Sequence, residues 1–158
     1  MTVSFDDNNR VMLYRQDGHF YLTLRAVHEG GSLEGTRINF ILDTGAYITV
    51  ISRKTAILCG FDKLQRIPAE IRGFTGRAMA DFVIIPSLRI LNNLITDVPV
   101  LIPHDTESDH EVLGLNILEY FNYYIDTEND RLYLKINPNP RPNNEALACG
   151  QIFTVDAK

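Results

Sequence analysis

Short runs of β-branched, aromatic and aliphatic residues, separated by turns of Gly, Asp and Asn, are the feature that most limits the fold of this chain. Asp17-Gly18 lies between two such runs over residues 11–27, and this pattern predicts a β-hairpin. Pro99 favours an edge or an irregular position for the strand that contains it. Regular turns with few helical patterns indicate an all-β barrel or sandwich. Further strands are predicted over residues 36–43, 48–52 and 94–103, and a second hairpin over residues 123–136.

Two short segments carry helical signals instead. Ser52 can cap a helix over residues 53–59 that stops at Gly60. Residues 115–121 place apolar side chains at helical spacing. Each of these segments follows a strand and a Gly-containing loop, which hints at an internal pseudo-repeat.

The length of 158 residues favours one domain with a sizeable core, and we assign it to residues 1–136. Alternating prolines make residues 137–144 an extended connector. Residues 151–155, with the sequence QIFTV, could then pair as a last strand. We therefore treat residues 137–158 as a Pro-rich extension of the domain.

Composition and charge argue against several classes of partner. The formal net charge of -5 gives no basic footprint for nucleic acid or for an anionic membrane surface. The first ten residues lack the features of a signal peptide, and no apolar stretch is long enough to span a bilayer. We therefore expect a cytoplasmic chain, unless it is a fragment of a larger protein.

Metal and cofactor chemistry has no support in the sequence. Cys59 and Cys149 lie far apart without metal-ligand spacing, so we expect ordinary thiols. His104 and His110 flank acidic residues, but the segment resembles a solvated loop more than a set of metal ligands. We expect neither a metal nor a cofactor.

One charged residue, Asp43, interrupts the apolar run FILDTGAYITVIS at residues 40–52. A carboxylate in core-like surroundings is costly unless it is neutralised, paired or kept for its chemistry. Thr44 supplies a hydroxyl and Gly45 permits a close backbone approach, so the segment predicts a strand that enters a tight loop displaying Asp43. An ordinary Asp-containing turn at the end of a strand is the alternative.

A second candidate element is a hairpin over residues 67–86 with Gly73 and Gly76 at its tip. Glycines at such a tip permit a tight, mobile turn, so the hairpin could lie over a site as a flap. A plain surface hairpin explains the same local pattern.

Two motifs in this order, ILDTGA at residues 41–46 and VLGLNIL at residues 112–118, resemble those of the retropepsin-like, retroviral-type aspartic proteases. The glycine-tipped hairpin between them and the hairpin after them extend the resemblance to about residues 11–136. It implies a small closed β-barrel with one or two short helices and a flap hairpin. Because the chain has one Asp-Thr-Gly, the resemblance also implies a homodimer with its site on the two-fold axis.

The resemblance also implies roles for particular residues. Asp43 of each chain would form a catalytic dyad, Thr44 would brace the two loops across the axis, and Gly45 would allow their close approach. Gly114 would pack behind the active-site loop, and residues 71–80 would form the flap. The implied substrate-binding residues are Ala46, Tyr47, Gly73, Phe74 and Gly76.

These features together predict an aspartic endopeptidase that acts as a homodimer on an extended polypeptide substrate. One alternative is a dimeric peptide-binding module that uses the same groove without cutting. Another is a monomeric structural β-protein in which the Asp turn is incidental. The terminal extension could supply an interface strand to the dimer, or it could occupy the groove as an inhibitor.

Overall fold

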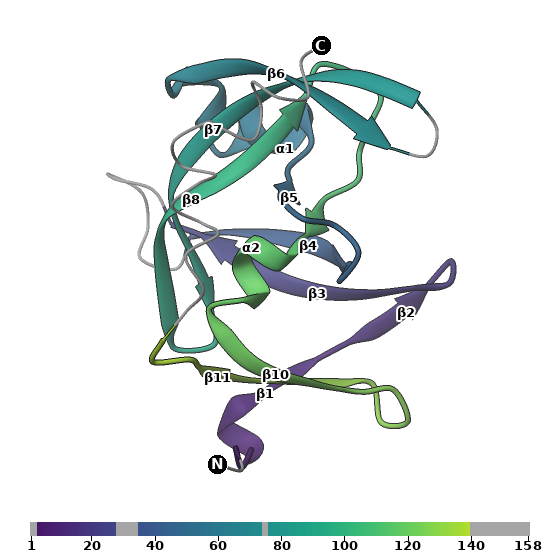
Figure 1. Cartoon of the computed structure of the whole chain (residues 1–158), viewed down its shortest axis with the longest axis vertical. Helices are drawn as coiled ribbons and strands as arrows, with labels where there is room; N and C mark the ends of the chain where they lie inside the picture. The colour runs from purple at the N-terminus through teal and green to yellow at the C-terminus, as the bar shows by residue number, and fades with distance from the viewer. Residues whose placement is uncertain (1–2, 28–34, 74–75, 140–158) are drawn as a thin grey trace.

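The computed structural model describes residues 3–27, 35–73 and 76–139, and these residues form β-strands with two short α-helices (Figure 1). The strands are β1 (Arg10–Met12), β2 (Tyr14–Gln16), β3 (His19–Ala26), β4 (Thr36–Leu42), β5 (Thr49–Val50), β6 (Arg66–Gly73), β7 (Gly76–Ile90), β8 (Asn93–Pro103), β9 (Val112–Leu113), β10 (Phe121–Asp126) and β11 (Arg131–Ile136). The α-helices are α1 (Arg53–Leu58) and α2 (Leu115–Leu118), and short 3₁₀ turns cover Asp7–Asn9 and Phe61–Lys63. The all-β prediction is confirmed.

The main sheet closes on itself. Its strand order is β2-β3-β4-β9-β5-β8-β7-β6, and a further antiparallel pairing joins β3 to β7, with Ala26 opposite Leu88. Just beyond this pairing the Ser87 hydroxyl donates a 2.7 Å hydrogen bond to the Val27 carbonyl. The Val27 N–H donates in return to the Ser87 carbonyl at 3.2 Å. The sheet is therefore the closed barrel that the resemblance implied.

A separate sheet joins the beginning of the described chain to its end. Its order is β1-β11-β10, and it lies at the bottom of Figure 1, beneath the barrel. The β10–β11 hairpin is the predicted second hairpin, with residues 127–130 as its turn. Arg15 Nε lies 2.8 Å from the Asp130 carboxylate, so the turn of this hairpin is also tied to β2.

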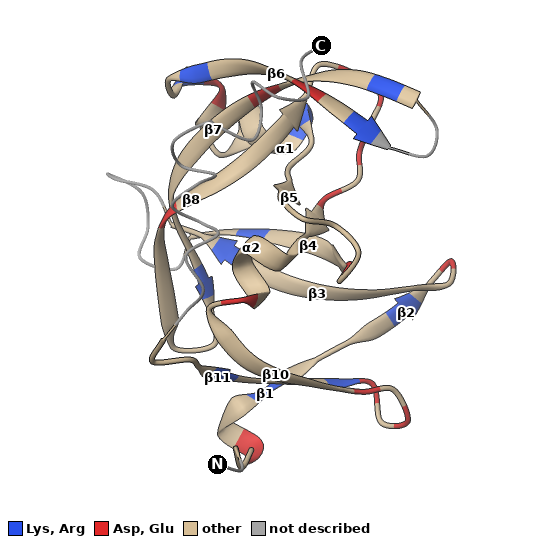
Figure 2. Cartoon of the chain, viewed as in Figure 1, with Lys and Arg blue, Asp and Glu red and all other residues tan. Residues whose placement is uncertain are grey.

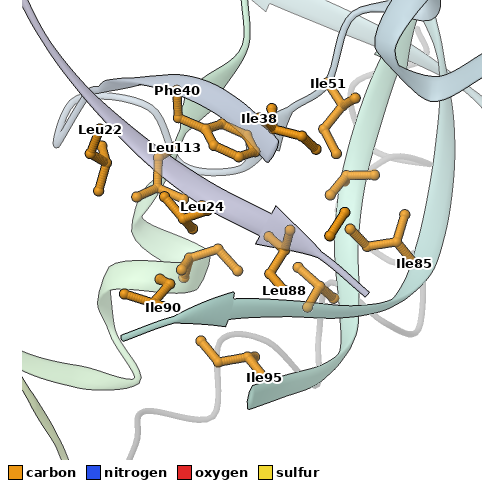
Figure 3. Packing of buried hydrophobic residues seen from close by; sticks show 14 of the residues in the cluster. Leu22, Leu24, Ile38, Phe40, Ile51, Ile85, Leu88, Ile90, Ile95 and Leu113 are labelled. Atoms are coloured by element: carbon orange, nitrogen blue, oxygen red, sulfur yellow. The ribbon is translucent and has the colours of Figure 1, made fainter. Parts of the chain in front are cut away.

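The hydrophobic core fills the interior of the barrel. Along β3, Leu22, Leu24 and Ala26 are buried while Thr23 between them is exposed, which is the alternation expected when one face of a strand meets a core. Side chains from β3, β4, β7 and β9 converge in Figure 3. A smaller buried cluster lies under the β6–β7 hairpin and consists of Ala69, Ala80, Phe82 and Leu101, with Ile48, Val50 and Ile71 packed against it.

Local predictions made from neighbouring residues are confirmed. Asp17 and Gly18 both have positive φ values, 51° and 79°, and form the turn between β2 and β3. Ser52 caps α1, because its hydroxyl accepts a 3.2 Å hydrogen bond from the Thr55 N–H. The helix ends before Gly60, which has a φ of 76°.

Several boundaries differ from those predicted. The strand expected over residues 48–52 is limited to β5, and the helical segment 115–121 is limited to α2 because β10 begins at Phe121. The strand that contains Pro99 is not at an edge, since β8 lies between β5 and β7. Pro99 is tolerated there because β5 pairs only with the two residues that follow it.

The predicted last strand and most of the connector lie outside the described residues, as does Cys149. None of the helices in the described ranges has the length and apolar character that crossing a membrane requires.

The barrel closure can be tested through Ser87. Ser87→Ala removes a hydrogen bond from a side chain that is 6% exposed, and we expect it to lower the free energy of unfolding by about 1–2 kcal/mol. Thr23→Val is the matched control, because the Thr23 hydroxyl donates a 2.7 Å bond to Asn39 on the exposed face of the barrel. Urea unfolding should show a change below about 0.5 kcal/mol for the control. Equal costs for the two variants would contradict a special role for Ser87 in closure.

Candidate active site

The loop after β4 holds the Asp43 carboxylate in one orientation. The Gly45 N–H donates a 2.8 Å hydrogen bond to Asp43 Oδ1, and the Ala46 N–H donates to the Asp43 carbonyl at 3.2 Å. The Asp43 N–H donates to the Leu113 carbonyl at 3.2 Å, which fixes the loop to β9. Asp43, Thr44 and Gly45 are all exposed in this chain. The loop therefore presents a fixed carboxylate to the surroundings.

The exposure of Asp43 corrects the expectation that the apolar run places it in a core. Phe40 and Ile41 are buried, but β4 ends at Leu42 and the chain turns at the next residue. Apolar neighbours in the sequence indicated burial, whereas the turn takes the carboxylate out of the barrel. Its charge is thus not buried within a single chain.

The two motifs lie directly against each other. β9 is inserted between β4 and β5, parallel to β4 with Leu42 opposite Leu113, and antiparallel to β5 with Val50 opposite Val112. The first residues of α2 continue this contact, since the Leu115 N–H donates to the Ala46 carbonyl at 2.9 Å. The second motif is therefore the support on which the Asp43 loop lies.

Gly114 makes this close contact possible. A Cβ atom at this position would lie 2.6 Å from the Ile48 carbonyl carbon and 2.8 Å from its oxygen, distances that real Cβ atoms essentially never show. The Gly114 N–H also donates a 3.1 Å hydrogen bond to Thr49 Oγ1. Gly114 thus packs behind the loop, as the resemblance implied.

A buried polar network extends this support and was not predicted. Thr49 is fully buried and Asn116 is 2% exposed. Asn116 Oδ1 accepts 2.8 Å hydrogen bonds from both the N–H and the hydroxyl of Thr49, while Asn116 Nδ2 donates to the Pro99 carbonyl at 2.8 Å. Because buried polar groups are costly when unpaired, this set of bonds fixes the relative positions of β5, β8 and α2.

A second buried polar contact joins the N-cap of α1 to the residue that directly precedes β9. The Ser52 hydroxyl donates a 2.6 Å hydrogen bond to Glu111 Oε1, and both residues are buried. Nearby, burial raises the pKa of the Cys59 thiol; a hydrogen bond with Thr36 opposes this shift and the Glu111 charge adds to it. A thiol held protonated in this way is a poor nucleophile, which agrees with the expectation of an ordinary thiol.

The residues expected to contact substrate come from two parts of the chain. Ala46 is half-buried and Tyr47 is 42% exposed, and both follow the Asp43 loop. Gly73 pairs with Gly76 at the end of the β6–β7 hairpin, while Phe74 lies outside the described residues. In Figure 1 the outer ends of β6 and β7 and the loop between β4 and β5 all lie on the right-hand side of the molecule.

The histidines of the segment after β8 differ from each other. His104 is exposed, as expected for a solvated loop, but its Nε2 also lies 2.8 Å from the Asp81 carboxylate, a contact that was not predicted. His110 is 69% exposed. In the described ranges, no group of three or more His, Cys, Asp or Glu residues could hold a metal ion.

The closed barrel and the paired motifs define a retropepsin-like aspartic protease fold. A solved structure, the retropepsin-like aspartic protease from Rickettsia conorii, matches 79% of this chain and 87% of its own chain, with 23% sequence identity and a TM-score of 0.58. The family model described as "gag-polyprotein putative aspartyl protease" matches residues 30–120. The match covers more than half of the chain, which therefore belongs to this aspartyl protease family. A comparison with curated proteins gives no match.

The contact at Gly114 can be tested against a glycine that needs only its backbone freedom. Gly114→Ala forces a Cβ into the backbone of Ile48, and we expect it to lower the free energy of unfolding by about 3 kcal/mol. Gly18→Ala is the control: that site has open space and a φ of 79°, so the expected cost is about 1 kcal/mol. Urea unfolding measures both. A cost for Gly114→Ala no larger than that of the control would contradict the packing role.

Proposed function

We propose that this chain is an aspartic endopeptidase that acts as a homodimer and hydrolyses peptide bonds in extended polypeptides. The observation that carries the proposal is the Asp43 carboxylate, exposed and oriented by the Gly45 N–H at 2.8 Å on a loop that β9 and α2 support from behind. A fixed carboxylate at a surface is the starting point for water activation. Membership of an aspartyl protease family supports the same reaction class.

One chain supplies half of the proposed site. Peptide hydrolysis by carboxylates needs a base for the water and an acid for the carbonyl oxygen, and the chain contains a single Asp-Thr-Gly. The buried Asp81 and Glu111 are bonded to partners of their own, Arg53 and His104 for Asp81 and Ser52 for Glu111. A two-fold axis beside the loop brings Asp43 opposite its own copy, which supplies the second carboxylate.

The proposed mechanism follows from this pairing. Two carboxylates a few ångströms apart cannot both ionise cheaply, so one proton is shared and the pair titrates as a unit. The ionised Asp43 takes a proton from a bound water, whose oxygen attacks the peptide carbonyl carbon. The protonated Asp43 donates to the carbonyl oxygen, which gives a tetrahedral diol. The Asp43 that took the water proton then gives it to the leaving nitrogen as the C–N bond breaks, and one diol hydroxyl returns its proton to the other Asp43, which restores the shared proton.

The remaining site residues have supporting roles in this proposal. Gly45 keeps Asp43 oriented and lets two loops approach, and Thr44 braces them across the axis through its hydroxyl. Ala46 and Tyr47 line the groove beside the dyad. Gly73, Phe74 and Gly76 cover the substrate from the β6–β7 hairpin, and backbone pairing holds the substrate in an extended form.

Replacing Asp43 tests the chemistry. Asp43→Asn removes both the base and the acid, so cleavage of an unstructured protein substrate should fall by about a thousandfold or more while the fold is kept. Wild-type activity should be highest near or on the acidic side of neutral pH, where the pair holds one proton. Asp17→Asn, in the exposed turn between β2 and β3, is the matched control and should retain full activity.

The assay is run at a concentration that favours dimers. Cleavage by Asp43→Asn at the wild-type rate would refute the assignment. Two inert but dimeric proteins would favour the peptide-binding module instead. If wild type and variant were both monomers at that concentration, the homodimer would be wrong.

Replacing Thr44 tests the proposed contact across the axis. Thr44→Ala removes the bracing hydroxyl from both chains, so the dissociation constant of the dimer should rise about tenfold, with a parallel loss of activity. Thr44→Ser keeps the hydroxyl and should stay close to wild type. Analytical ultracentrifugation measures the dissociation constants, and an unchanged value for Thr44→Ala would remove Thr44 from the interface.

A further inference from the structure

A row of three arginines crosses the outside of the barrel where the sheet closes on itself. Arg25 of β3 lies directly opposite Arg37 of β4 on one side and opposite Arg89 of β7 on the other. Because the β3–β7 pairing closes the sheet, the row lies over the seam of the barrel. Figure 2 shows basic segments of β3, β4 and β7 close together at this seam, left of the centre of the view. The register of three strands thus brings three cationic side chains together.

All three arginine side chains are on the outer face of the sheet. Residues directly opposite each other in a ladder share a face, and side chains along one strand alternate between the two faces. Leu24 and Leu88, which precede two of the arginines in the sequence, are buried in the core. Arg25 and Arg89 are partly buried and Arg37 is exposed. The three guanidinium groups are therefore presented at the surface of the barrel.

The arginine row lines a surface hollow of about 550 Å³ together with Thr23 and Leu91. No carboxylate is among the described residues that line this hollow. The chain as a whole has a formal net charge of -5, so the lining is opposite in sign to the protein that surrounds it. A concave surface lined by one sign of charge attracts a ligand of the opposite sign. The hollow is therefore suited to an anion.

Several other arginines already have a carboxylate partner. These ion pairs are Arg10–Asp7, Arg15–Asp130, Arg53–Asp81 and Arg77–Glu70. Within the described ranges, neither Arg37 nor Arg89 has an ion pair or a side-chain hydrogen bond. Arg25 does have an interaction partner, so only the two arginines that flank it are assigned as ligand contacts. The donors of Arg37 and Arg89 are available to an anion.

The spacing of the two flanking arginines indicates the size of this anion. They lie one strand apart on either side of β3, and neighbouring strands are about 4.8 Å apart, so their backbones are about 10 Å from each other. Each guanidinium presents a planar fork of N–H donors that matches a phosphoryl group with two parallel hydrogen bonds. A ligand with two linked phosphoryl groups gives each of the two forks a group of its own.

We propose that this hollow is a binding site for a diphosphate group, with one phosphoryl group held by Arg37 and the other by Arg89. The same chemistry is offered by free pyrophosphate and by the diphosphate of a nucleotide. Like charges opposite each other on neighbouring strands are destabilising, and a bound anion offsets this repulsion. A diphosphate therefore joins β4 to β7 across β3 and stabilises the seam of the barrel.

The hollow is distant from the proposed active site. Arg37 is near the start of β4, whereas Asp43 directly follows its last residue. An extended strand of this length places the two positions about 20 Å apart. Diphosphate binding is therefore separate from the proposed peptidase activity, and the Asp43→Asn variant should bind the ligand as the wild type does.

Isothermal titration calorimetry of the full chain with inorganic pyrophosphate, at low ionic strength, tests the inference. The wild type should bind one pyrophosphate per chain with a dissociation constant below about 1 mM. Arg37→Gln and Arg89→Gln should each weaken binding about tenfold, because each removes the donors to one phosphoryl group. Arg10→Gln is the matched control: it removes one positive charge from β1, in the other sheet, and should bind as the wild type does.

Thermal unfolding supplies a second readout and shows that each variant is folded. Pyrophosphate should raise the Tm of the wild type and of Arg10→Gln, because it binds only the folded chain. The Tm of Arg37→Gln should respond much less to the same concentration. Arg37 is exposed, so its replacement leaves the core intact; if Arg89→Gln fails to fold, the Arg37→Gln comparison still decides.

Two further ligands sharpen the assignment. Orthophosphate, with a single phosphoryl group, should bind about tenfold more weakly than pyrophosphate. Equal binding of the two would overturn the assignment of one phosphoryl group to each arginine. Tighter binding of ADP than of pyrophosphate would support the site and identify its ligand as a nucleotide, whereas equal or weaker binding of ADP would support free pyrophosphate.

The remaining outcomes separate this site from the proposed activity. A wild type without saturable pyrophosphate binding, or with binding that Arg10→Gln weakens as much as Arg37→Gln does, overturns the inference whether or not the protein cleaves peptides. Binding that depends on Arg37 and Arg89 in a protein without cleavage activity supports the diphosphate site, and the loss then falls on the endopeptidase alone.

Discussion

The close approach between Gly114 and the backbone of Ile48 is the contact on which the candidate site depends. It lets the two-residue strand β9 lie between β4 and β5. These are the strands before and after the Asp43 loop, so β9 supports the loop at both of its ends. Any side chain at this position would push the loop away from β9. The support then continues through Thr49 and Asn116, whose hydrogen bonds are buried and mutually satisfied. The Asp43 carboxylate is thus held by backbone geometry more than by side chains around it.

The same arrangement explains why the chain can present a carboxylate without burying it. The core of the barrel includes apolar side chains from β3, β4, β7 and β9, and it contains none of Asp43, Thr44 and Gly45. The loop is exposed in a single chain, yet its backbone is hydrogen-bonded to β9 and α2. A rigid but exposed surface suits a contact with a second copy, because little order has to be gained on association.

The sequence predicted those features that depend on neighbouring residues. The Asp17-Gly18 turn and the Ser52 cap each depend on local conformational preferences and local hydrogen bonds, and both are found. The two motifs were expected to act together, and they are in contact. The all-β barrel was predictable from the spacing of the turns and from the resemblance.

Features that depend on distant parts of the chain were not predictable from the sequence. Thr49 and Asn116 are 67 residues apart, and nothing in either local pattern indicates their partner. The same holds for Asp81 and Arg53, which are 28 residues apart. The exposure of Asp43 was also missed. The apolar composition of residues 40–52 indicates that the segment contributes to a core, but it does not indicate the residue at which the backbone turns away from that core.

In the proposed dimer, two copies of Asp43 make one active site. Mixing wild-type chains with Asp43→Asn chains, at constant total concentration and with time for exchange, tests it most directly. If both carboxylates are needed, activity follows the square of the wild-type fraction, and an equal mixture retains about a quarter of the activity. A linear dependence, with about half the activity in the equal mixture, would show that each chain works alone and would contradict a site shared by two chains.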